Sequence, residues 1–79
     1  MKLPRDISAS ELIHLLQKLG YSVSRQKGSH IRITTLLNGE HHVTIPNHNP
    51  IKLGTLAFII NDVAAHFNKT KEGIAKDLF

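Results

Sequence analysis

The sequence predicts an α+β fold in which a three-stranded antiparallel sheet carries both main helices on one face. Apolar residues recur at helical spacing near the start of the chain and again in its second half. Between these regions lie segments of alternating apolar and polar residues, separated by glycine-containing turns. A helix–strand–strand–strand–helix order of this kind buries one face of the sheet under the helices.

The first helix begins at a capping box formed by Ser8 and Glu11. In this motif the serine hydroxyl accepts the backbone N–H three residues on, and the glutamate carboxylate accepts the serine N–H. We expect the helix to end at Gly20, which can take the left-handed conformation of a helix C-cap. His14 falls on the polar side and is interpreted as a surface histidine. The leucines at helical spacing are Leu12, Leu15, Leu16 and Leu19.

A β-hairpin follows, with Gly28-Ser29 at its tip. Glycine adopts positive φ without steric penalty, so the tip can join arms that span residues 21–27 and 30–36. Side chains alternate between the two faces of a strand. The second arm therefore places Ile31 and Ile33 on the core face, and His30, Arg32 and Thr34 on the other.

The dipeptide Asn38-Gly39 predicts a second tight turn, which leads into a third strand over residues 41–45. An unbroken pleat gives Val43 and Ile45 to the core face. The opposite face then receives His42 and Thr44, beside His30 and Arg32. Two prolines mark the following loop, which contains His48.

A second helix is predicted from about Lys52, and it closes the core. Its apolar stripe consists of Leu56, Ile59, Ile60, Val63 and Phe67. Thr70 is placed to cap a short tail helix in which Ile74 and Leu78 face inward. We therefore expect one domain over residues 1–79, with its core at about 3–67 and a tail at 68–79.

Charge is distributed unevenly along the 79 residues, whose formal net charge is +4. No acidic residue lies between Glu11 and Glu40, and the hairpin within that stretch is rich in Arg and Lys, so an anionic partner is favoured. The absence of cysteine excludes a disulfide framework and a thiolate metal site. No apolar run is long enough to span a membrane, and the first residues lack a signal-peptide pattern, so we expect a cytoplasmic protein.

The hairpin combines an imidazole with fixed cations, which suits cleavage of an RNA phosphodiester through the neighbouring 2′-hydroxyl. His30 is the candidate proton-transfer group, because an imidazole exists in both protonation states near neutral pH. A second proton-transfer group is absent from the hairpin motif, and the candidates are His42, His48 or a water molecule. The candidate RNA-binding residues are Arg25, Lys27, Ser29 and Arg32.

Three other interpretations are compatible with parts of the sequence. His41, His42 and His48 could suggest a metal site, but neighbouring strand residues point to opposite faces and no carboxylate pair accompanies them, so no metal or other cofactor is expected. A non-catalytic RNA-binding module would need the same cations and no imidazole. A protein-interaction domain would use its basic face to bind an acidic partner.

Four blocks of the sequence resemble the HicA toxin family, also called YcfA-like. Residues 25–30, with the Gly-Ser-His turn, and residues 52–56, with a Gly-Thr-Leu helix start, carry most of the resemblance. The other two blocks are Leu3-Pro4 followed by residues 8–19, and the Val43-Thr44-Ile45-Pro46 run with His48. The resemblance implies a fold like the double-stranded RNA-binding domain and metal-independent cleavage of messenger RNA, with His30 as the catalytic residue. It also implies an antitoxin, HicB, that masks this histidine, and it leaves the oligomeric state open.

Overall fold

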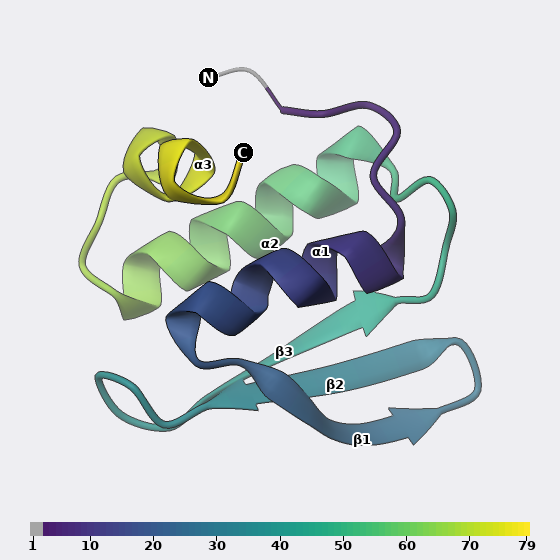
Figure 1. The fold of residues 1–79 in the computed structure, drawn as a ribbon, viewed down its shortest axis with the longest axis horizontal. Helices are drawn as coiled ribbons and strands as arrows, with labels where there is room; N and C mark the ends of the chain where they lie inside the picture. The colour runs from purple at the N-terminus through teal and green to yellow at the C-terminus, as the bar shows by residue number, and fades with distance from the viewer. Residues whose placement is uncertain (1–2) are drawn as a thin grey trace.

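The computed structural model describes residues 3–79, in which two helices pack on one face of a three-stranded sheet (Figure 1). A third helix packs against α2 on the side away from the sheet (Figure 1). The elements are α1 (Ala9–Leu16), η1 (Gln17–Leu19), β1 (Ser22–Lys27), β2 (His30–Thr35), β3 (His41–Pro46), α2 (Leu53–His66) and α3 (Lys71–Leu78). The strand order is β1-β2-β3 with both pairs antiparallel, which confirms the predicted α+β class and the short tail helix.

The capping box at the start of α1 forms as predicted. The Ser8 hydroxyl accepts the Glu11 backbone N–H at 3.1 Å, and the Ser8 N–H donates to the Glu11 carboxylate at 3.0 Å. At the other end α1 tightens into the 3₁₀ turn η1 and stops at Gly20, whose φ is +83°. A Cβ at Gly20 would lie 2.8 Å from the side chains of Leu37 and Thr35, so both the backbone angle and the close packing require glycine.

Cross-strand pairing confirms which residues of β2 and β3 face the core. Ile31 pairs with Ile45 and Ile33 pairs with Val43, and all four side chains are buried beneath the helices. Residues on one face of a strand alternate with those on the other. The face of the sheet that the helices do not cover, called the outer face below, therefore carries His30, Arg32, Thr34, His42 and Thr44.

The helices complete the core with the stripe that the sequence predicts. Leu56, Ile60 and Val63 of α2 are fully buried, whereas Phe67 lies just past the helix end and is half-buried. Thr70 caps α3 by accepting the Gly73 N–H at 3.0 Å. The remaining large side chains with almost no exposed surface are Tyr21, Leu12, Leu16, Ile33, Ile45, Ile51, Ile59 and Ile74.

The turn between β2 and β3 is anchored to the end of α2. Asn38 and Gly39 both have positive φ, as their turn prediction requires. The Asn38 side-chain amide donates to the backbone oxygen of His66 at 2.7 Å, and the His66 ring Nε2 donates to the backbone oxygen of Leu37 at 2.9 Å. One side-chain and one backbone group of this turn therefore hydrogen-bond to His66 at the end of α2.

Candidate functional site

A basic cluster, consisting of His30 with Arg25, Lys27 and Arg32, lies on the outer face at the hairpin end of the sheet. Lys27 pairs with His30 across the tight turn, and Arg25 pairs with Arg32. Directly opposed residues of antiparallel strands share a face, so all four side chains project from the same side. The side chains of Arg25, Lys27 and His30 are exposed, and that of Arg32 is half-buried. The cluster is accessible to a large ligand because no helix covers it (Figure 1).

A β-bulge at Ser24 makes this arrangement compatible with the core. Val23 pairs with Ile33 on the core face, and strict alternation would place Arg25 and Lys27 on that same face. The register shifts between Val23 and Arg25, which turns the basic residues to the outer face. The Ser24 hydroxyl donates to the backbone oxygen of Arg32 at 3.2 Å across the irregularity. The sequence interpretation had no signal for this bulge.

The hairpin tip is joined to the loop that follows β3. The backbone N–H of Asn47 donates to the carbonyl oxygen of Ser29 at 2.6 Å, and Pro46 pairs with His30. His48 follows directly, and its own backbone is fixed because its N–H donates to Pro46 and its oxygen accepts the N–H of Ala9 at 3.2 Å. The structure therefore brings the backbone of His48 to the same end of the sheet as His30.

His42 lies at the opposite end of the outer face. It pairs with Thr34, four residues from His30 along β2, which is about 13 Å of strand. Both ring nitrogens are engaged, Nδ1 with the Thr34 hydroxyl and Nε2 with the Glu40 carboxylate, each at 2.7 Å. The Thr34 hydroxyl in turn contacts the Ser24 hydroxyl at 2.7 Å. The structure thus separates His42 from His30 and commits its ring to other partners.

Comparison with known proteins gives one match. The model of a family described as the HicA toxin of bacterial toxin–antitoxin matches residues 9–64 of the 79-residue chain. The chain belongs to the HicA toxin family. Neither the curated proteins nor the solved structures yield a match. Membership identifies the chain as the toxin of a toxin–antitoxin module, in which the partner is an antitoxin.

In this HicA chain the acidic residues lie away from the basic cluster. Of the acidic residues in the described part of the chain, 3–79, Glu40 is the one at the outer face, where its carboxylate binds His42 at the end away from the hairpin tip. Asp62 and Asp77 belong to helices, and Asp77 forms an ion pair with Lys69 at 3.1 Å. A phosphate approaching the cluster therefore meets fixed positive charge with no neighbouring carboxylate to oppose it.

A third histidine of the HicA chain, His41, has partners that the sequence interpretation missed. Its Nδ1 lies 2.7 Å from the hydroxyl of buried Tyr21, and its Nε2 donates to Asp62 at 3.2 Å. The ring also stacks on His66, with centroids 4.4 Å apart. Within the described chain, 3–79, no group of three His, Cys, Asp or Glu side chains could hold a metal ion. His41 is therefore a packing residue that joins β3 to α2.

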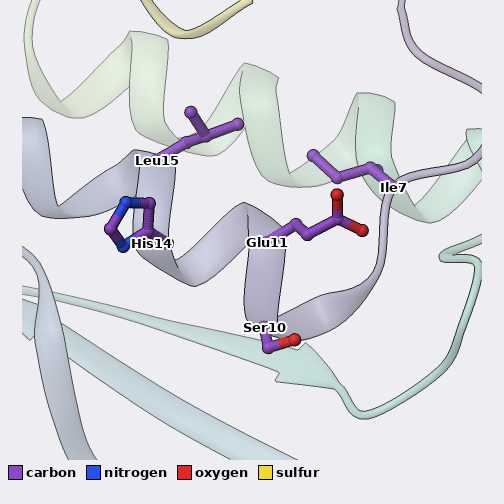
Figure 2. A pocket seen from close by; sticks show the side chains of 5 residues that line it. All are labelled: Ile7, Ser10, Glu11, His14 and Leu15. Atoms are coloured by element: carbon purple, nitrogen blue, oxygen red, sulfur yellow. The ribbon is translucent and has the colours of Figure 1, made fainter.

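A hollow on α1, shown in Figure 2, contains Glu11 and His14 but no member of the basic cluster. The hydrogen bond from the Ser8 backbone, followed by that from the Ser8 hydroxyl, lowers the pKa of the Glu11 carboxyl below its ordinary value. The carboxylate is thus committed to capping the helix. Ile7 and Leu15 supply the apolar walls of the hollow.

None of the helices in residues 3–79 is long and apolar enough to cross a membrane.

Proposed function

We propose that this HicA toxin is a metal-independent endoribonuclease that cleaves messenger RNA, with His30 as its proton-transfer group. The observation that carries the proposal is the basic cluster: one imidazole and three fixed cations share an open face, and within residues 3–79 none of the four forms an ion pair with a carboxylate. A negatively charged strand can lie across such a face, because the helices occupy only the other side (Figure 1).

The chemistry follows from the two kinds of group in the cluster. The 2′-oxygen of a ribose attacks the adjacent phosphorus, the bond to the 5′-oxygen breaks, and a cyclic phosphate remains. His30 takes the proton from the 2′-hydroxyl or delivers one to the departing 5′-oxygen. Arg25, Lys27 and Arg32 bind the phosphate oxygens, where negative charge increases in the transition state.

His48 is the better candidate for the second proton-transfer group. The hydrogen bond between Asn47 and Ser29 holds the backbone next to His48 against the hairpin tip. His42 sits about 13 Å along the strand and has both ring nitrogens engaged. We therefore assign the complementary acid or base role to His48, with Ser29 supporting the phosphate at the tip.

The antitoxin partner is proposed to be a HicB-like protein that covers the basic cluster. An exposed face that binds RNA is also the face whose occlusion would silence the toxin. Its positive charge favours an acidic patch on the antitoxin, since complementary potentials speed association and fix register.

One observation favours the alternative, a non-catalytic RNA-binding module. Within residues 3–79 no side chain hydrogen-bonds the His30 ring, whereas a catalytic imidazole is commonly oriented by a third group. If the protein is an endoribonuclease, the bound RNA itself must orient the His30 ring. Substitution of His30 separates the two readings.

The test compares His30→Ala with His14→Ala, which removes an exposed histidine from α1, in RNA cleavage assays that contain EDTA. We expect the first variant to lose at least about 100-fold in cleavage rate and the second to match the parent. Both should unfold at the parental urea midpoint, because neither side chain is buried. Parental cleavage by His30→Ala would reject the imidazole as catalyst, and loss of parental activity in EDTA would reject metal independence.

Two further variants test the second group. His48→Ala should reduce the cleavage rate, and His42→Ala should leave it close to the parental value. The opposite pattern would reassign the role to His42.

A further inference from the structure

A second hollow lies at the end of the outer face away from the hairpin tip. It has a volume of about 390 Å³. Ser22 and Thr34 form a cross-strand pair on the outer face, and the two leucines follow the end of β2. The residues that line this hollow, called the leucine hollow below, are Gly20, Ser22, Thr34, Leu36 and Leu37.

The backbone of the leucine hollow is held in place by hydrogen bonds on both sides of Leu37. The N–H of Leu37 donates to the Thr35 hydroxyl at 3.1 Å, and its oxygen accepts from the His66 ring at 2.9 Å. The Thr35 hydroxyl itself donates to the backbone oxygen of Leu19 at 2.8 Å. Gly20 allows the Leu37 side chain to pack directly against the chain. The hollow is therefore formed before any ligand arrives.

The side chains of the leucine hollow suit a largely apolar group with a polar edge. Leu36 is 74% exposed and Leu37 is 53% exposed, so a ligand that covers them removes apolar surface from water. The Thr34 hydroxyl is already engaged by Ser24 and His42. The Ser22 hydroxyl, on the neighbouring strand, is the group left to bond the edge of a ligand.

The leucine hollow and the basic cluster lie along the same strand, β2. Alternate residues of β2 run from His30 through Arg32 and Thr34 along the outer face, and Leu36 follows in the hollow. Arg32 precedes Thr34 by about 7 Å of strand. A single-stranded RNA whose phosphates contact the cations would therefore extend over the hollow.

We propose that the leucine hollow binds one nucleobase of the RNA strand whose phosphate backbone occupies the basic cluster. The inference rests on the proposed function, since it takes RNA as the ligand of the outer face. Bases of single-stranded RNA are unstacked and can turn into such a site. A protein side chain from the antitoxin would fit the leucines too, but the serine hydroxyl and the continuity with the phosphate-binding cations favour a base.

The test scans short RNA substrates in which one nucleotide at a time is replaced by an abasic ribose, so that the phosphates remain and one base is removed. The proteins are the parent, Leu36→Ala and the matched control Phe58→Ala. Phe58 is 73% exposed and lies on α2, on the helical side of the sheet. We expect the parent to lose about tenfold in kcat/KM at one abasic position beside the cleavage site, because the removed base no longer covers the apolar surface of the two leucines. Leu36→Ala should lose that sensitivity at the same position, and Phe58→Ala should keep it.

The inference fails if Leu36→Ala shows the parental abasic profile, or if the parent is indifferent to base removal at every position. It also fails if Leu36→Ala keeps the profile and instead loses binding to the antitoxin. The same series of abasic RNAs can be tested for binding to His30→Ala, with Kd as the readout, so that this measurement does not depend on cleavage. If the parent does not cleave while the abasic profile appears in Kd, the nuclease proposal is wrong and the base site stands.

Discussion

Tyr21, which lies between η1 and β1, connects to β3 and α2 through its hydroxyl group. The side chain is 1% exposed, and its oxygen lies 2.7 Å from Nδ1 of His41, whose other nitrogen binds Asp62. Burial of the phenol, and secondarily the charge of Asp62, raises the pKa of Tyr21 above its ordinary value of 10.0. The folded chain therefore favours the protonated phenol more strongly than the unfolded chain does.

The variant Tyr21→Phe tests this network. It leaves the part-buried Nδ1 of His41 without its partner, so we expect the free energy of unfolding to fall by about 1 kcal/mol at pH 7. The contribution of a group with a raised folded pKa is complete below the unfolded pKa and is lost as pH rises past it. Urea unfolding of parent and variant should therefore show a difference that narrows above pH 10. A difference that stays constant to pH 11 would contradict the raised pKa.

Single residues differ in how far the sequence alone could place them. His30 and Arg32 were placed correctly on the outer face, because alternation along one strand needs only local information. His41 was not assigned its role, because its partners Tyr21 and Asp62 are 20 and 21 residues away in the chain. Contacts of that kind depend on how α2 packs over β3, which periodicity does not specify.

At the scale of elements, β1 places a fixed charge opposite a like charge of β2, because Arg25 pairs directly with Arg32. Opposed like charges destabilise a pair of strands. The hairpin therefore holds a charge density that favours an anionic ligand at the expense of its own stability.

Replacement of one of these charges should stabilise the protein. We expect Arg25→Gln to raise the free energy of unfolding by about 0.5 kcal/mol at low salt, since it removes the repulsion with Arg32. The gain should vanish at high salt, where exposed charges are screened. The matched control is Lys18→Gln, which removes one charge from the exposed η1 turn. Urea unfolding at two salt concentrations checks the prediction, and equal effects of both variants would refute it.

Helix starts could be predicted from the sequence because their signals are local. Ser8 and Thr70 each accept the N–H three residues on, as their residue types indicate. The bulge at Ser24 could not be predicted in this way. It becomes visible only when both arms of the hairpin are aligned, with Val23 opposite Ile33 and Lys27 opposite His30.

At the scale of the whole molecule, cations lie on both sides of the sheet. The basic cluster is on the outer face, whereas Lys18, Lys71 and Lys76 lie on η1 and α3, outside the sheet. Each phosphate neutralised on a single strand contributes about −0.7 to the slope of log affinity against log salt, so three contacts give about −2. Joint replacement of Arg25, Lys27 and Arg32 by Gln should flatten the RNA-binding slope by that amount.

A matched control for net charge replaces Lys18, Lys71 and Lys76 by Gln, which removes three charges outside the sheet. We expect this control to keep most of the parental slope. Filter binding or fluorescence anisotropy over a range of salt concentrations measures the slopes of both triple variants. If the two triple variants behave alike, net charge rather than the outer face determines the affinity.

The bare outer face also has a genetic consequence. Under the proposed function, mutations that silence this toxin fall into two classes, because the residues that hold the fold and those proposed to bind RNA lie on opposite sides of the sheet. A core mutation removes the folded protein and every activity with it. A change at the outer face leaves a folded, inert copy, and wherever its antitoxin contacts survive, that copy still competes for antitoxin and shifts the balance toward any active toxin in the same cell.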